Sequence, residues 1–251
     1  MNKIQIIYKN KNFLAINKPA GLLMHQTSFS TKKEPTLADF LLKNFPEVKN
    51  VGDDPINRPG IVHRLDKDTS GVILIARNQN YFEYLKNLFQ KHQIKKTYLA
   101  LVYGKINPPD GGRKGLTLSL PKGVIESAIS LKPGTTKRTI HKGKMTKEAI
   151  TEYEVVKIFE HINEKDNAKY FSLVKVMPKT GRTHQIRVHL ASIGNPIVGD
   201  TMYGHKENTL NLMRQFLHAE SIEFNIDENN KIKIEADLPE DLRKGLKNLD
   251  K

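Results

Sequence analysis

The sequence contains no cysteine among its 251 residues. Disulfide bonds, thiolate catalysis and cysteine-based zinc or iron–sulfur sites are therefore excluded. Long hydrophobic runs are also absent: no apolar stretch approaches the roughly 18 residues of a membrane span. The N-terminal stretch MNKIQIIYKNKN lacks the apolar core of a signal peptide. Together these absences predict a cytoplasmic protein with no membrane partner.

Acidic residues are scarce relative to basic ones. The chain has 27 Asp and Glu against 41 Lys and Arg, which gives a net charge of +14. Such a surplus favours a polyanionic partner, because each Lys or Arg docked on a phosphate releases counterions. A solvated, lysine-rich surface is the alternative interpretation. The length and the hydrophobic fraction of 38% are sufficient for a folded domain with a full core.

Motifs for nucleotides and metals are missing or weak. Neither a G-x-x-x-x-G-K-S/T loop nor a G-x-G-x-x-G turn is present. His184 and His189 are five residues apart, about 140° around a helix, so they do not share a face as a zinc-binding pair would. A metal site that uses Asp66, Asp68 and Asp200 with histidines stays a weak alternative.

Hydrophobic periodicity predicts the elements of secondary structure. Strands are expected at 4–8, 13–16, 72–76, 96–103, 151–160, 170–178, 216–225 and 231–236, and helices at 36–45, 79–90, 183–193 and 239–249. Gly194 is expected at the C′ position of the third helix, and Pro239 at the start of the fourth. Strands outnumber helices and several are linked as hairpins. The predicted fold class is α+β, with a mainly antiparallel mixed sheet and flanking helices.

Residues 105–147 differ in character from the rest of the chain. They are rich in Gly, Pro, Lys and Thr, and contain short strand-like pieces such as LTLSL with little periodicity. We interpret them as an excursion within a single domain that spans residues 1–251, and not as a separate fold.

The stretch HRLDKDTSG, residues 63–71, places five ionisable residues just before the apolar run VILIA. Residue type and spacing leave three interpretations open for Asp66: a catalytic carboxylate, a metal ligand or a turn residue.

HRLDKDTSG resembles the H-R-L-D-x-x-T-S-G signature of the RluA-like family of pseudouridine synthases. The resemblance extends to FLAINKPAGLLMH (13–25), KTYLALVYG (96–104), PKTGRTHQIRVHLASIGNPIVGDTMYG (178–204) and LMRQFLHAESIEF (212–224). Order and spacing agree across about residues 5–240, except in the excursion. The S4-type domain that precedes the catalytic domain in larger members is not expected, because the opening motif begins almost at Met1.

The resemblance implies that uridine in RNA is isomerised to pseudouridine without cofactor or metal. The C1′–N1 glycosidic bond is broken, the uracil rotates, and C5 is joined to C1′. Asp66 matches the family's catalytic aspartate, which acts either as a nucleophile at C1′ or as a base at C2′. Ribosomal RNA is the first expected substrate and transfer RNA the second. The resemblance implies no protein partner, so we expect a monomer.

Other residues receive roles from the same resemblance. Tyr98 matches the active-site tyrosine, which stacks on uracil and helps to remove the C5 proton. Arg187 matches the arginine that keeps the carboxylate of Asp66 ionised. Arg64 is expected to fill the space of the extruded base and to pair with phosphate.

Further candidates have weaker support. Arg182 is expected to contact phosphate. Ile186 is a candidate substrate contact that also belongs, with Leu190 and Ile193, to an expected packing face of its helix. Lys18 is expected either to contact RNA or to be solvated. His63 and the 69–71 turn are expected to position Asp66 through hydrogen bonds.

Two rival functions follow from the same residues. The first is a non-catalytic RNA-binding protein or RNA chaperone on the same scaffold. The second is a metal-dependent phosphodiesterase that uses Asp66, Asp68 and histidines.

Overall fold

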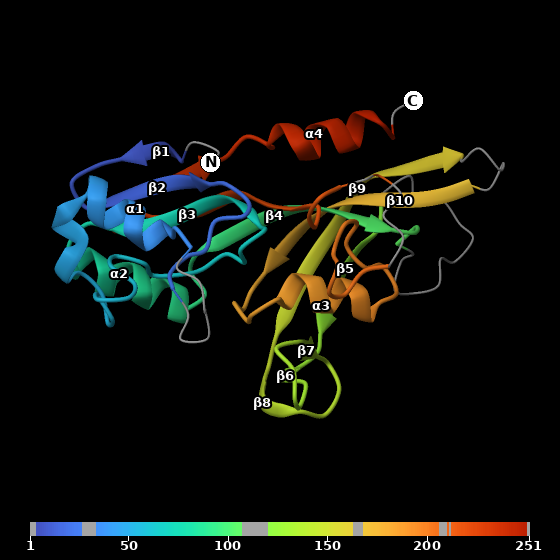
Figure 1. Ribbon diagram of the computed structural model, residues 1–251, viewed down its shortest axis with the longest axis horizontal. Coiled ribbons are helices and arrows are strands. Elements are labelled where there is room, and N and C mark those ends of the chain that lie inside the picture. The colour runs from blue at the N-terminus through green and yellow to red at the C-terminus, as the bar shows by residue number, and fades with distance from the viewer. Residues whose placement is uncertain are drawn as a thin grey trace. The chain divides into compact units, whose positions relative to one another are not determined.

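The computed structural model describes residues 4–26, 34–106, 120–162, 168–205, 210 and 212–249. The chain divides into two compact units, of which the first takes residues 1–95 and 219–237 and the second 96–218 and 238–251 (Figure 1). Within the described ranges, no helix has both the length and the apolar composition needed to cross a membrane.

The first unit is built on a sheet that contains three antiparallel strand pairs. Its strands are β1 (Gln5–Lys9), β2 (Phe13–Lys18), β3 (Ser70–Ala76), β11 (Leu217–Asn225, from its third residue on) and β12 (Lys231–Glu235). They follow the order β1-β2-β3-β11, and β12 pairs with β11. The pairs β1–β2, β2–β3 and β11–β12 are antiparallel. All seven residues of β3 are buried, as the continuous apolar run VILIA predicts.

The helices of the first unit are α1 (Leu37–Asn44), the 3₁₀ helix η1 (Pro46–Asn50) and α2 (Gln79–Gln90). The bounds of α2 agree with the sequence prediction, because local signals fix both its start and its face. The side chain of Asn78 caps the first turn by accepting from the Tyr81 N–H at 2.9 Å. Phe82 and Leu85 recur at helical spacing and pack into the core of this unit with Leu74 of β3.

The second unit contains a four-stranded sheet in the order β4-β10-β9-β5. Its strands are β4 (Lys95–Tyr103), β5 (Lys122–Glu126), β9 (Ile150–Ile162) and β10 (Ala168–Pro178). The pairs β4–β10, β10–β9 and β9–β5 are all antiparallel. Figure 1 shows β9 and β10 as a long paired ribbon in yellow and gold. The two units confirm the predicted α+β class with a mainly antiparallel sheet.

Part of the excursion forms a small sheet of its own, in the order β7-β6-β8. Its strands are β6 (Ile129–Leu131), β7 (Arg138–Thr139) and β8 (Lys144–Lys147). In Figure 1 this small sheet lies at the lower end of the second unit. The predicted strand-like piece LTLSL lies, except for Leu120, outside the described residues. The prediction of a single domain spanning 1–251 stays a prediction.

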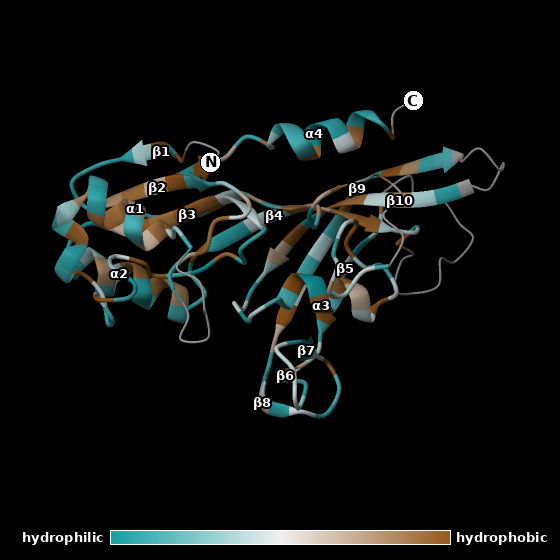
Figure 2. Ribbon diagram, viewed as in Figure 1, coloured by the Kyte–Doolittle hydropathy of each residue, from teal (hydrophilic) through white to brown (hydrophobic). Residues whose placement is uncertain are grey.

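The remaining helices are α3 (Gln185–Ser192) and α4 (Glu240–Lys247) of the second unit. Gly194 occupies the C′ position of α3, as predicted, with φ +79°. Its N–H donates to the Ala191 oxygen, and that of Asn195 to the Leu190 oxygen, which is a Schellman ending. Figure 2 shows α4 as mostly hydrophilic with isolated hydrophobic residues, of which Leu242 is buried in the core of this unit.

Candidate active site

Asp66 lies in a tight turn that leads directly into β3. The N–H of Thr69 donates to the main-chain oxygen of Asp66 at 3.1 Å, and β3 begins at the next residue, Ser70. The turn therefore spans residues 66–69 and not the predicted 69–71. The Asp66 side chain is half-buried, whereas Leu65 and Thr69 are buried. A carboxyl group is thus held at the edge of a core by its neighbours in sequence.

A buried lysine holds this turn through hydrogen bonds to main-chain oxygens. Lys18, the last residue of β2, is 0% exposed, and its ammonium donates to the main-chain oxygens of Pro19, Leu22 and Lys67 at 2.8, 2.9 and 2.9 Å. The N–H of Gly21 also donates to the Lys67 oxygen, at 3.0 Å. Lys18 is therefore neither solvated nor placed to contact RNA, and the expectation for this residue was wrong. We call this arrangement the Lys18 clamp.

His63 and Gly71 fix the turn against the sheet of the first unit. The N–H of Leu74 donates to Nε2 of His63 at 2.9 Å, so the ring proton of a neutral His63 lies on Nδ1. Gly71 has a φ of +118°, and a Cβ there would lie 2.2 Å from the oxygen of Ala219 in β11. Only glycine fits this close approach of two strands, which explains why the motif ends in Gly.

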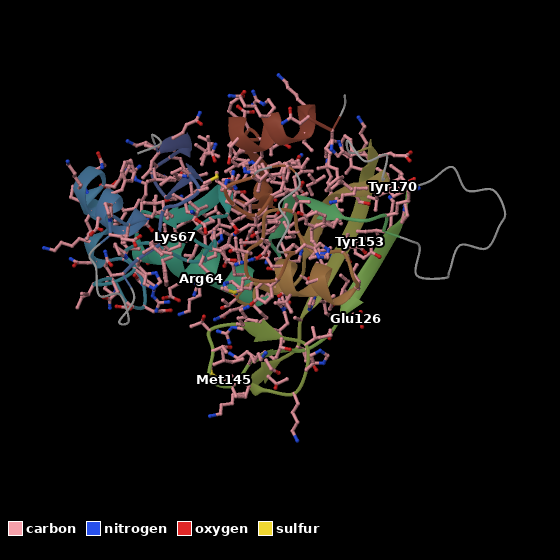
Figure 3. The ribbon with its side chains drawn as sticks, turned by 45° about the vertical axis from the view of Figure 1, so that its right-hand side comes forward. Arg64, Lys67, Glu126, Met145, Tyr153 and Tyr170 are labelled. Atoms are coloured by element: carbon pink, nitrogen blue, oxygen red, sulfur yellow. The ribbon has the colours of Figure 1, made fainter. Side chains whose placement is uncertain are left out.

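Cationic side chains surround Asp66 in sequence. Arg64 is exposed, and the exposed Lys67 pairs with Glu34 at 2.7 Å (Figure 3). The pKa of His25 lies below its ordinary value, first because of burial and then because of the charges of Arg58 and Arg64.

Tyr98 and Lys96 share one face of β4 in the second unit, because alternate residues of a strand point to the same side. Tyr98 is half-buried, packs against the core of this unit and lies opposite Val176 of β10. The ammonium of Lys96 donates to the oxygen of Thr180 at 3.3 Å, and burial lowers the pKa of Lys96 to about 8. Lys96 was not among the site residues predicted from the sequence.

The loop before α3 is fastened to β9 through Gln185. The side-chain oxygen of Gln185 accepts from the Thr180 hydroxyl at 2.7 Å and from the Arg182 N–H at 3.0 Å. Its side-chain nitrogen donates to the Ile150 oxygen and the Thr151 hydroxyl at 3.0 and 2.9 Å. The helix therefore begins at Gln185, two residues later than predicted.

Arg187 is held by a carboxylate of its own unit. Its Nε and Nη2 donate to the two oxygens of Asp200 at 2.7 and 2.9 Å. The predicted action of Arg187 on the carboxylate of Asp66 stays a prediction. Sequence spacing gave no sign of this pairing, because the two residues are separated by a helix end and a turn.

The two remaining candidates lie close to Arg187 in sequence. Ile186 is buried in the core of the second unit together with Leu190, whereas Ile193 is 39% exposed and does not complete the predicted packing face. Arg182 is exposed, and its Nε donates to the oxygen of Glu148 at 3.0 Å. The six candidates thus divide into Arg64 and Asp66 in the first unit and the other four in the second. Among the residues that the structure describes, no cluster of three or more His, Asp or Glu could hold a metal ion.

Comparison with solved structures defines the class of fold. The chain aligns with human RNA Pseudouridylate Synthase Domain Containing 1 at a TM-score of 0.69 and 24% identity, covering 94% of this chain and 84% of that one. Human RNA Pseudouridylate Synthase Domain Containing 4 aligns at a TM-score of 0.67 and 23% identity, covering 98% and 92%. The fold is that of pseudouridylate synthase domains.

Sequence comparison then gives the family. The model of the RNA pseudouridylate synthase family matches residues 12–192, which include parts of both units. Ribosomal large subunit pseudouridine synthase D of Borreliella burgdorferi is 34% identical over 237 residues, covering 94% of this chain and 65% of that protein. An uncharacterized RNA pseudouridine synthase of Bacillus subtilis is 32% identical over 249 residues, covering 99% and 73%. The chain belongs to the RNA pseudouridylate synthase family, which confirms the resemblance found in its motifs.

The length of these relatives differs from that of this chain. The chain spans 65% of the Borreliella burgdorferi protein and 58% of an uncharacterized RNA pseudouridine synthase of Aquifex aeolicus, to which it is 38% identical over 208 residues.

Proposed function

We propose that this protein isomerises specific uridines in structured RNA to pseudouridine. The observation that carries the proposal is the family match across residues 12–192, which includes Asp66 in its clamped turn. The net charge of +14 is consistent with RNA as the partner.

In the proposed reaction, Asp66 acts on the ribose. As a nucleophile it attacks C1′ and displaces N1 of uracil; as a base it removes the C2′ proton and leaves a glycal. In either route the uracil rotates and C5 forms the new bond to C1′. In the first route this breaks the bond between C1′ and the Asp66 oxygen, and in the second Asp66 returns the proton to C2′. The proton on C5 is then lost and N1 ends protonated, so electrons balance without an oxidant or a reductant.

The other candidates are assigned parts of the same reaction. Tyr98 stacks on the uracil and assists removal of the C5 proton. Arg187 supplies guanidinium donors that favour the ionised Asp66 carboxylate. Arg64 occupies the space left by the extruded base, which costs a few kcal/mol to flip out. Arg182 contacts phosphate, and Ile186 supplies apolar surface to the substrate.

The RNA partner is proposed to be ribosomal, with transfer RNA as the second choice. The Borreliella burgdorferi relative is named for the large ribosomal subunit, which supports this order. Between 127 and 147 the chain carries six cations and no Asp or Glu: Lys132, Lys137, Arg138, Lys142, Lys144 and Lys147. We assign this segment to RNA binding and target choice. A monomer in the cytoplasm completes the proposal, because both RNA classes are found there.

The test uses RNA that carries tritium at C5 of uridine, because isomerisation releases that hydrogen to water. Asp66→Asn should abolish tritium release while RNA binding persists within about threefold. Asp68→Asn is the matched control, since it removes the other carboxylate of the same turn, and it should stay active. Tritium release by Asp66→Asn at the wild-type rate would refute the proposal.

The same assay separates the rivals. An RNA chaperone would bind RNA but release no tritium even as wild type. A metal-dependent phosphodiesterase would cleave the RNA and lose activity with a chelator. Mapping pseudouridines in total RNA with and without the gene identifies the target.

A further inference from the structure

A buried ion pair in the second unit joins α3 to the segment that follows it. Asp200 receives the Nε and Nη2 hydrogens of Arg187 in a bidentate arrangement, at 2.7 and 2.9 Å. The two side chains are 7% and 0% exposed, so the pair is removed from water. A bidentate pair fixes the plane of the guanidinium as well as its position.

The Asp200 carboxylate is itself held by main-chain donors. The N–H groups of Met202 and Tyr203 donate to its Oδ1 at 2.9 and 3.1 Å. Burial acts to raise the pKa of Asp200, but the hydrogen bonds and charge of Arg187 and these two donors outweigh it, so the pKa lies below its ordinary value. Asp200 is therefore an ionised group whose orientation is set by the backbone.

That backbone has little room to move. Gly199 has a φ of +75°, and a Cβ there would lie 2.2 Å from the oxygen of Arg214. At Gly204, a Cβ would lie 2.4 Å from the oxygen of Asp200. Larger residues do not fit at either glycine, so the turn that carries Asp200 is packed closely on both sides.

The face of the guanidinium is also fixed. The guanidinium carbon of Arg187 lies 5.1 Å from the centre of the Tyr203 ring, within cation–π range. The hydroxyl of Tyr203 is hydrogen-bonded to Nδ1 of His184 at 2.9 Å and accepts from the Arg138 N–H at 2.7 Å. Asp200 thus fixes the position and plane of the Arg187 guanidinium, and the anchored ring of Tyr203 packs beside it.

We propose that Asp200 is a positioning residue for the isomerisation: it orients Arg187 and neutralises its charge, so that Arg187 acts through directed N–H donors and not through net positive charge. This inference rests on the proposed function. Asp200 takes two of the five N–H groups of the guanidinium. The others keep a fixed direction because the pair cannot rotate.

The test is a double-mutant cycle on the single-turnover rate at saturating RNA. Asp200→Asn and Arg187→Lys should each lower the rate by about 100-fold, since a small misplacement of a catalytic donor has that effect. The double variant should be no slower than the slower single variant, because each change destroys the same arrangement. RNA affinity should change by less than about threefold in all three.

The matched control is Asp241→Asn, which breaks another bidentate pair of this unit. Arg214 donates to Asp241 through Nε and Nη2 at 2.7 and 3.1 Å. Breaking that pair should lower thermal stability and leave the single-turnover rate unchanged. The Nε–H NMR signal of Arg187, slowly exchanging in the wild type, should exchange rapidly in Asp200→Asn.

The outcomes separate the two proposals. If the wild type releases tritium but the losses of the two single variants multiply to about 10⁴-fold, the positioning role of Asp200 is refuted and the proposed function stands. A single-turnover rate for Asp200→Asn equal to that of the wild type would also refute the positioning role and leave the proposed function standing. Wild-type protein that releases no tritium from any RNA refutes the proposed function, and this inference with it.

Discussion

Replacing Lys18 with methionine tests whether the clamp holds the turn of Asp66. Methionine fills a similar volume but offers no donor to the oxygens of Pro19, Leu22 and Lys67. Hydrogen bonds from a charged group contribute about 1.5–3 kcal/mol each, so the loss of three amounts to about 4.5–9 kcal/mol. Methionine avoids the cost of burying a charge, which is several kcal/mol. We expect a net loss of about 3 kcal/mol in the free energy of unfolding.

Urea denaturation followed by circular dichroism measures this loss. Lys67→Met is the matched control, because Lys67 lies in the same turn but forms an exposed pair with Glu34 that contributes at most about 1 kcal/mol. Because the clamp fixes the turn of Asp66, Lys18→Met should also lower turnover more than RNA affinity. If Lys18→Met and Lys67→Met unfold at the same urea concentration, the account of the clamp is wrong.

Three further predictions concern other parts of the chain. Burial lowers the pKa of Lys96 to about 8 in the folded state, so the unfolded chain holds more protons between pH 8 and about 10.4. The free energy of unfolding of the wild type should therefore rise with pH across that window, by at most about 3 kcal/mol. Lys96→Met should remove this rise, which is measured by urea unfolding of both proteins at pH 7.5 and pH 10. Thr36→Ala removes the capping box of α1 and should cost about 1 kcal/mol in thermal unfolding. Glutamine at Lys132, Lys142 and Lys144 should weaken RNA binding and reduce its salt dependence by about 0.7–0.9 per lost phosphate contact, without changing the unfolding midpoint.

The regular elements were predictable because their signals are local. A continuous apolar run predicted β3 and helical spacing predicted α2, each within two residues, and Gly194 ended α3 as expected. The start of α3 was missed because it depends on Gln185, whose side chain bonds to residues up to 35 positions away. Long-range hydrogen bonds leave no trace in sequence periodicity.

The candidate site divides in the same way. Motifs identified Asp66, Tyr98 and Arg187 as candidates, since each falls at a distinctive position of a long matching pattern. Lys18, which holds the turn of Asp66, was misjudged, and Asp200, which pairs with Arg187, was considered only as a weak candidate metal ligand. Their roles depend on burial and on partners brought close only by the fold, which residue type alone does not indicate.

The small sheet β7-β6-β8 was also beyond sequence analysis. Its strands have two to four residues, too short to show the alternation that identifies a strand. Met145 of β8 is 70% exposed and has a φ of +54°, so this strand is also irregular in the structure (Figure 3). Composition alone therefore described this segment as irregular.

The two ends of the segment that carries the small sheet lie side by side at the end of β5 and the start of β9. Glu126 pairs with Ile150 across β5 and β9, and the N–H of Ser127 donates to the Ala149 oxygen at 3.2 Å. Residues 128–148 therefore leave and rejoin the chain at neighbouring main-chain positions, as the loop of a hairpin does. Such a loop can lengthen, shorten or be exchanged without shifting the register of the strands that carry it. Under the proposed function, exchange of this segment would replace its RNA-binding cations while the Lys18 clamp and the Arg187–Asp200 pair stay in place. The new segment would have to supply the hydrogen bond that the Arg138 N–H donates to Tyr203.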